Sequence, residues 1–480
     1  MKSLFKNSIY FVGYRLINVI YPLITATYVS RVLKPAGVGE AALAQNIVIF
    51  LVAVALLGIP NYGVREISKT SENDIDRLFT ELFLINFVST LIISILYYST
   101  IDLLCLELNR KLYRIYGIIL LFNVINVDWF YQGKEEFKYI TIRSAIVKAV
   151  SVVAIFVFVR DETDICAYGL IFALAYVGNY TFNAINLKKY VDFSFKNLNI
   201  KRHLNSIFAL SITAISNEIY VTLDTFMLGV LSTNTEIGYY SNSMKLMRIL
   251  INVVTAFGAV ILPRLSKLQH KKDYLQFNII INKVINILLW VTIPCTIGII
   301  LLSETIVVVL FGRDFAPASC IMIILSFLII PRAFSNLSLQ VLVCTKNDTK
   351  TSKVYFTGML INCVLNLIFI RYIGAKGAAV ASVISEVYIC LVLFNYSKEL
   401  FIYKRNKKYV FSLMMSVISM LVLVKILEYC MLRLGASLMS ILIICIITGI
   451  FEYVAMTLLT QNEVTLFFIS KLKQKVGRTI

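Results

Sequence analysis

The chain has 480 residues, of which 59% are hydrophobic and only 15% are charged, and its formal net charge is +19. Soluble domains carry about 25% charged residues, so this composition excludes an ordinary soluble enzyme. The apolar residues form blocks of roughly 20, the length of helix that crosses about 30 Å of hydrocarbon. The sequence therefore predicts an all-α polytopic membrane protein.

Fourteen apolar blocks follow one another along the chain and are predicted to be membrane-spanning helices. The blocks are 4–33, 40–60, 78–99, 112–131, 139–159, 165–187, 204–231, 237–262, 279–302, 318–344, 354–370, 377–397, 410–428 and 436–460. Lys and Arg gather in alternate loops, such as 188–202 and 398–408, so the positive-inside rule places both termini in the cytoplasm. The basic balance is therefore a topology signal and not a sign of nucleic-acid binding. Residues 464–476 predict a short amphipathic helix on the inner surface.

The loops between the blocks are short, which disfavours a membrane glycan polymerase or glycosyltransferase with a large exposed catalytic loop. The nine cysteines include no CxxC pair, and no GxxxxGK[ST] loop occurs. We therefore expect no metal site, no cofactor and no direct use of ATP. His203 and His270 fall in predicted cytoplasmic loops, which argues against a histidine proton relay within the membrane.

Two segments 199 residues apart share one layout, which predicts an internal duplication. Residues 28–45 and 227–244 each run from an apolar helix end through a short polar link to a Val/Ile-Gly pair, with Gly39 and Gly238 as the glycines. Such repeats are common in transporters, where two similar bundles enclose a site near the middle of the membrane. The alternative is that any tight helix hairpin requires a glycine.

Cations inside apolar blocks are costly, so we expect them to face a wet interior or a partner. Several share polar stripes at helical spacing: Arg15 with Asn18, Lys245 and Arg248 with Asn252, and Arg332. A cavity lined by these side chains would suit an anionic passenger, and arginine suits phosphate in particular. Static ion pairing between helices is the alternative. Lys148, Lys283 and Lys425 lie nearer block ends and are expected to reach the membrane surface.

Oxygen-bearing side chains form a second set of stripes, which could hold a small coupling cation. Asp224 lies in the seventh block, Asn362 and Asn366 are one turn apart in the eleventh, and Ser382 lies in the twelfth. Hydrogen bonds between membrane helices explain such residues equally well, and spacing alone favours that interpretation.

The stretch "DWFYQGKEEFKYITIRSAIVK", residues 128–148, resembles the signature of Wzx-type polysaccharide flippases of the MATE-like exporter superfamily. Other stretches resemble the same family in matching order: "SRVLKPAGVGEAALAQ", "GIPNYGVREISK", "DTFMLGVLSTNTEIGYYSNSMKL", "LFGRDFAPA" and "GAKGAAVAS". The resemblance implies fourteen helices in two pseudo-symmetric six-helix lobes, residues 1–190 and 191–400. Two further helices and a cytoplasmic tail would follow in residues 401–480.

The resemblance also implies a function in the bacterial cytoplasmic membrane. A protein of this family would move an undecaprenyl-diphosphate-linked oligosaccharide from the inner to the outer leaflet by alternating access. The oligosaccharide would then enter capsule, O-antigen or exopolysaccharide, and a repeat-unit polymerase and glycosyltransferases are the expected partners. The rivals are a MATE-type drug/cation antiporter, which the cationic stripes disfavour, and a lipid II flippase, which the Trp-Phe-Tyr-Gln-Gly stretch disfavours.

The inner-face motif has two interpretations. Asp128, Trp129, Gln132 and Gly133 would form either a docking lip for the passenger or an anchor, with aromatic rings at the membrane interface and Gly133 turning the chain. The anchor is the favoured interpretation.

Similarity to the lipid II flippase branch also gives the oxygen-rich positions a role. Asp224, Asn362, Asn366 and Ser382 resemble its sodium site, although Asn366 stands where that branch has a carboxylate. Sodium coupling is therefore one hypothesis and proton coupling the other.

Overall fold

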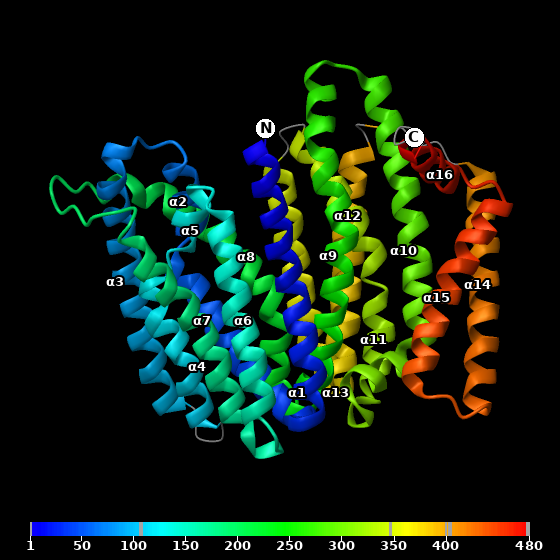
Figure 1. The fold of residues 1–480 in the computed structure, drawn as a ribbon, viewed down its shortest axis with the longest axis horizontal. Coiled ribbons are helices and arrows are strands. Elements are labelled where there is room, and N and C mark those ends of the chain that lie inside the picture. Colours follow the sequence, from blue (N-terminus) through cyan, green and yellow to red (C-terminus); the bar gives the residue numbers. More distant parts are fainter. Residues whose placement is uncertain (1, 105–108, 345–347, 399–400, 402–405, 477–480) are drawn as a thin grey trace. The chain divides into compact units, whose positions relative to one another are not determined.

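A computed structural model describes the chain apart from residues 1, 105–108, 345–347, 399–400, 402–405 and 477–480 (Figure 1). Every element in the described ranges is a helix. The α-helices are α1 (Lys2–Leu56), α2 (Ile59–Ile67), α3 (Glu72–Leu104), α4 (Arg110–Phe122), α5 (Asp128–Gly133), α6 (Phe137–Phe158), α7 (Ile165–Leu187), α8 (Lys201–Leu231), α9 (Asn234–His270), α10 (Tyr274–Phe311), α11 (Ala318–Ser326), α12 (Ile329–Cys344), α13 (Asp348–Ser397), α14 (Lys407–Arg433), α15 (Leu438–Leu459) and α16 (Glu463–Val476). Three short 3-10 helices are η1 (Asn123–Ile125), η2 (Glu162–Asp164) and η3 (Arg313–Phe315).

Ten segments of the described chain are long and apolar enough to cross a membrane, which confirms the polytopic membrane class. Two of the helices they fall in contain a kink. In α1 the backbone leaves the helical region at Lys34, with φ 57°, just before Pro35, which has no N–H to donate. In α13 the break falls at Ile373 and Gly374, where the glycine adopts φ 57° without steric cost. Helix α13 contains the predicted blocks 354–370 and 377–397, and α1 contains the block 4–33 and most of the block 40–60.

The chain folds as two compact units, unit 1 (Met1–Ser241) and unit 2 (Asn242–Ile480). In unit 1 the short helices α2 and α5 lie at the upper end of the bundle (Figure 1). The core there joins α2, α3 and α5, and it includes Phe79, Trp129 and Tyr131, each at most 2% exposed. The rings of Phe79 and Trp129 stack with centroids 5.5 Å apart.

This core corrects the anchor interpretation of the inner-face motif. Trp129 and Tyr131 are packing residues and not interface rings, because α2 and α3 cover them. Gly133 does not turn the chain either, since it is the last residue of α5 and lies against Ile67 of α2, where a Cβ would come within 2.8 Å. The chain turns two residues later, at Glu135, with φ 57°.

In unit 2, α10 packs with α14, α15 and the predicted tail helix α16. The Trp290 indole N–H donates to Thr465 Oγ1 at 3.1 Å, which attaches α16 to α10. Lys283 Nζ lies 5.7 Å from the centroid of the Phe467 ring, a cation–π contact. Lys425 pairs with Glu428 at 2.7 Å. The bonding partners of these two lysines are therefore protein groups of unit 2.

The two segments of the predicted duplication meet within unit 1. A Cβ added to Gly39 would overlap the Asn234 carbonyl oxygen, and one added to Gly238 would overlap the Pro35 carbonyl oxygen. Each glycine therefore allows the other segment's backbone to approach. The common ancestry of the segments remains a prediction, but their reciprocal contact explains why both carry glycine.

Candidate functional site

The clearest cationic face lies on α9. Lys245 and Arg248 are one turn apart, Asn252 follows at the next turn, and helical spacing places all three on one side. Lys245 is half-buried, whereas Arg248 and Asn252 are exposed. Two neighbouring cations of this kind repel each other, so the face is electrostatically suited to an anion with more than one charge.

Arg332 on α12 has an acidic partner. Its Nε lies 3.0 Å from Oε2 of Glu386, which is fully buried in α13, while about a third of the arginine side chain (32%) stays exposed. A buried carboxylate requires such compensation. Arg332 therefore forms an ion pair between two helices, as the alternative to a passenger cavity predicted. Part of its side chain nevertheless stays accessible.

Arg15 and Asn18 belong to α1 in unit 1, whereas the other four predicted cavity residues belong to unit 2. The Arg15 side chain lies outside the described part of the structure. Asn18 Oδ1 accepts a hydrogen bond from Lys148 Nζ, and the same Nζ lies 5.3 Å from the centroid of the Tyr21 ring. The expectation that Lys148 reaches the membrane surface is thus wrong, because α1 supplies its partners. The convergence of the six residues on one cavity stays a prediction.

The predicted coupling residues also fall into two groups. Asp224 of unit 1 is buried and accepts a hydrogen bond from the Tyr240 hydroxyl. In unit 2, Asn366 Nδ2 donates to Asn362 Oδ1 at 3.0 Å, and both residues are buried, as is Ser382. Among the residues that the structure describes, no group of three His, Cys, Asp or Glu side chains could hold a metal ion.

The two halves of α13 pack against each other around its kink, because a Cβ on Gly358 would come within 2.5 Å of Ile389 Cγ1. This antiparallel packing brings Asn362 and Asn366 into the same region as Ser382. The hydrogen bond between Asn366 and Asn362 is the contact established within this set, and the joining of Ser382 to them in one site stays a prediction.

A buried polar network lies behind the inner-face motif. Arg143 of α6 pairs with Asp128 Oδ1 at 3.0 Å and donates to Asn179 Oδ1 at 3.1 Å and to Asn183. Arg143 is 6% exposed. Sequence alone does not single out Arg143, because it follows Lys134 and Lys138 closely at the start of the block 139–159. The signal for it was the pair Asn179 and Asn183, one turn apart in the sixth apolar block.

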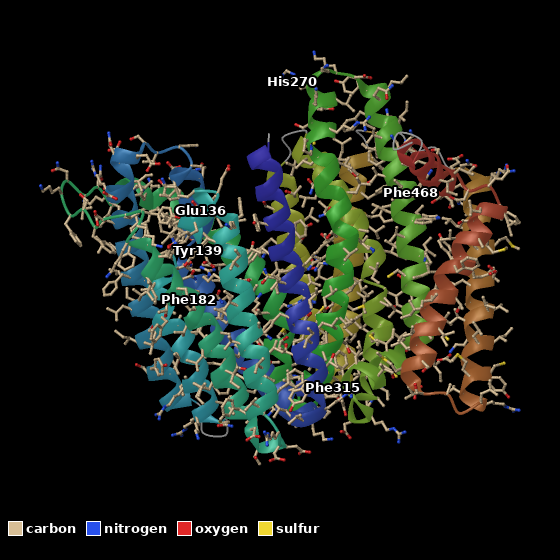
Figure 2. All side chains as sticks on the ribbon, viewed as in Figure 1. Glu136, Tyr139, Phe182, His270, Phe315 and Phe468 are labelled. Atoms are coloured by element: carbon tan, nitrogen blue, oxygen red, sulfur yellow. The ribbon has the colours of Figure 1, made fainter. Side chains whose placement is uncertain are left out.

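A groove with a volume of about 410 Å³ opens beside this network, between α6 and α7. Figure 2 shows three of its residues, Glu136, Tyr139 and Phe182, one below another from the upper end of unit 1 towards its middle. The lining residues are Glu136, Lys138, Tyr139, Ile142, Arg143, Ile146 and Phe182.

A second network surrounds the fully buried Glu81 of α3. Its carboxylate contacts His203 Nε2 at 2.7 Å, Arg202 Nη2 at 2.7 Å and the backbone N–H of Asn199 at 2.6 Å. The other ring nitrogen of His203 lies 2.7 Å from the Tyr62 hydroxyl. The prediction that His203 lies in a loop is wrong, because it is a buried residue in the first turn of α8. These charge-assisted bonds fix the connection before α8 to α3.

Comparisons with known proteins agree with this architecture. The family model described as "Polysaccharide biosynthesis protein" matches residues 4–269, and the one described as "Lipid II flippase MurJ" matches residues 168–448. A protein of Escherichia coli (strain K12) named "Putative O-antigen transporter" is 24% identical over 426 residues, which cover 85% of this chain and 98% of that protein. A Haloferax volcanii protein named "Probable low-salt glycan biosynthesis flippase Agl15" is 25% identical over 174 residues, 36% of this chain and 37% of its own.

A solved structure of the lipid II flippase MurJ, in an inward closed conformation, aligns with a TM-score of 0.76. The alignment covers 97% of this chain and 99% of that one at 16% identity, so it establishes the fold. Since each family model spans more than half of the sequence, the chain belongs to the polysaccharide biosynthesis protein family and, through residues 168–448, is related to the lipid II flippases.

Proposed function

We propose that this protein is a flippase that moves undecaprenyl-diphosphate-linked oligosaccharide repeat units from the inner to the outer leaflet of the bacterial cytoplasmic membrane. The observation that carries the proposal is the match to the protein named for O-antigen transport, which extends over nearly the whole length of that relative. The protein acts as a transporter and not as an enzyme. The repeat units that it moves would supply O-antigen, capsule or exopolysaccharide synthesis. A repeat-unit polymerase and glycosyltransferases would be its partners.

The proposed topology has fourteen membrane passes and two cytoplasmic termini. The kinked helices α1 and α13 would each cross twice, and α4 and α9 would provide the passes that the ten candidate spans do not include. Residues 1–190 and 191–400 would form the two lobes, followed by residues 401–480.

In this proposal the cationic side chains bind the diphosphate. Lys245 and Arg248 present adjacent charges on α9, and Asn252 adds an amide one turn away. Charged donors form the strongest hydrogen bonds to phosphate oxygens. Arg15, Asn18 and Arg332 would complete the set, and the diphosphate would compete with Glu386 for the Arg332 guanidinium.

The reciprocal glycine contact suggests how one end of the passage closes. Gly39 and Gly238 lie in the two predicted lobes, and each meets the backbone of the opposite segment. With both termini inside, this contact would lie at the outer face. Its separation would then accompany release of the passenger in an alternating-access cycle.

A cation gradient is the proposed energy source. Asp224, Asn362, Asn366 and Ser382 would bind Na⁺, or Asp224 would carry a proton, and the Tyr240 hydroxyl would hold the Asp224 carboxylate when the site is empty of cation. Flipping in vesicles under an imposed sodium or proton gradient tests this. If flipping responds to neither gradient, the coupling role of these residues is excluded.

One observation favours a second candidate passenger. The match of residues 168–448 to the lipid II flippase family makes lipid II itself an alternative. Expression in cells depleted of their own lipid II flippase separates the two, because only a lipid II flippase would restore growth. A MATE-type drug antiporter is disfavoured, since adjacent Lys245 and Arg248 would repel a cationic drug.

Complementation provides the test of the proposed function. The gene would be expressed in a strain that lacks its O-antigen flippase and carries a repeat unit of the native type. Surface glycan detected with a lectin is the expected result. Accumulation of the lipid-linked repeat unit in the inner leaflet, with normal amounts of the protein in the membrane, would argue against the proposal.

A further inference from the structure

The groove between α6 and α7 lies outside the proposed passenger site. Both helices are among the candidate membrane spans, so the groove opens on the side of a membrane-embedded bundle. Tyr139 links the two helices near the upper part of the groove, because its hydroxyl donates to the Phe182 carbonyl oxygen at 2.7 Å.

Below Tyr139 the walls of the groove are apolar and exposed. Ile142 is 45% exposed, Ile146 is 55% exposed, and Phe182 on the facing helix is 50% exposed. The exposed apolar surface continues along α6 through Val150 and Val153. Side chains this exposed in a membrane span contact lipid, and a concave arrangement of them fits a single hydrocarbon chain.

Above Tyr139 the groove ends among charged residues. Lys138 lines it and is exposed, and Lys188 and Lys189, which directly follow α7, are exposed as well. Glu136 also lines the mouth, and its carboxylate faces Tyr190, whose pKa is raised by burial and then by this carboxylate. Lys138 and Glu136 balance each other in the lining, so the positive charge at this end of the groove comes from the exposed Lys188 and Lys189 that follow α7. This modest charge suits a singly charged headgroup better than a diphosphate.

We propose that this groove binds one anionic phospholipid of the inner leaflet, with its phosphodiester at Lys138 and an acyl chain along Ile142, Ile146 and Phe182. The arrangement of a basic pocket between membrane helices above an apolar wall is what recognition of an anionic lipid requires. The assignment to the inner leaflet depends on the proposed topology.

A bound lipid would also support the network behind the inner-face motif. The Arg143 guanidinium lies 5.7 Å from the centroid of the Tyr139 ring and forms the back of the groove. Arg143 in turn holds Asp128 and Asn183. Filling the groove would exclude water from this face of Tyr139, so the lipid would stabilise the junction of α5, α6 and α7.

The test uses the full-length protein purified in detergent, and it measures the thermal unfolding midpoint and lipid retention by native mass spectrometry. The probes are phosphatidylglycerol, phosphatidylcholine, undecaprenyl phosphate and inorganic phosphate. Lys138→Ala is the test variant, and Lys271→Ala, an exposed lysine between α9 and α10, is the matched control. Ile146→Trp, which fills the apolar part, is the second variant.

Phosphatidylglycerol is expected to raise the unfolding midpoint of the wild-type protein and of Lys271→Ala more than phosphatidylcholine does. Its affinity for Lys138→Ala should be about fivefold weaker, the effect of one lysine at a membrane surface. Ile146→Trp should lose lipid retention while its midpoint without lipid is unchanged.

Equal binding of phosphatidylglycerol to Lys138→Ala and to the wild-type protein would overturn the proposal. Equal protection by inorganic phosphate would also overturn it, because it would show an anion site that binds no acyl chain. Stronger binding of undecaprenyl phosphate would overturn it as well, because the groove would then belong to the polyprenyl lipid of the passenger. Because no flipping is measured, these outcomes are independent of the proposed transport function.

Discussion

The Arg332 guanidinium and the Glu386 carboxylate pair at 3.0 Å inside unit 2, and the carboxylate is fully buried. This relationship changes the expected effect of removing the arginine. Arg332→Ala would leave an uncompensated buried charge, so we expect a loss of about 3–5 kcal/mol in the free energy of unfolding. Arg332→Ala with Glu386→Gln should recover most of that loss, because the neutral amide needs no counter-charge. Chemical denaturation of the purified variants measures both, and equal stability of the single and double variants would contradict the pairing.

Arg248 offers a cleaner test of passenger binding because it is exposed on α9. Arg248→Ala should abolish glycan export, because the proposed diphosphate site loses one of its two adjacent positive charges on α9, while the amount of the protein in the membrane stays normal. Surface glycan and membrane protein level, measured in the same cells, check this. Lys271→Ala is the control for loss of one positive charge and should export normally. Full export by Arg248→Ala would remove α9 from the binding site.

The glycine contact predicts a conformational effect. In Gly39→Ala and in Gly238→Ala the new methyl group would overlap the opposing carbonyl oxygen, so the two segments could not close. Cysteine pairs introduced across the contact between the segments 28–45 and 227–244 should crosslink less than in the wild-type background. Export should fall at least tenfold. Gly298→Ala is the matched control, because a Cβ there meets nothing within 4 Å. Unchanged crosslinking in both test variants would show that the contact does not act as a closure.

The bonds of Glu81 predict a stability effect in unit 1. His203→Ala removes one partner of a fully buried carboxylate, and we expect it to cost about 1–3 kcal/mol. His203→Gln can still donate to Glu81 and should cost less. The thermal unfolding midpoint of the purified variants gives the ranking, and if alanine is no worse than glutamine, the hydrogen bond does not stabilise this junction.

Much of the fold could be predicted because it depends on local sequence patterns, such as apolar blocks and helical periodicity. Apolar blocks predicted the polytopic membrane class, which ten candidate spans in the described chain confirm. The helix at residues 464–476 followed from its amphipathic spacing and is present as α16. The α9 stripe of Lys245, Arg248 and Asn252 was also visible in the sequence, since it depends only on helical periodicity.

The partners of buried charges could not be predicted in the same way. Glu81 and His203, which are hydrogen-bonded, are 122 residues apart in the sequence. Arg143 donates a hydrogen bond to Asn183, which lies 40 residues further along the chain. Such pairs are chosen by tertiary packing, which leaves no periodic signal. Likewise, the sequence marks Trp129 as an aromatic near a membrane surface, and only the packing of α2 and α3 against it shows that it is a core residue.

The rate at which a lipid-linked diphosphate oligosaccharide crosses the bilayer of proteoliposomes tests the central claim most directly. The full chain would be reconstituted with a labelled substrate, and a membrane-impermeant glycosidase would report its appearance on the outer surface. We predict rapid movement with the wild-type protein, a rate near that of empty vesicles with Arg248→Ala, and a normal rate with Lys271→Ala. A wild-type rate equal to that of empty vesicles, or equal rates for wild type and Arg248→Ala, would contradict the account.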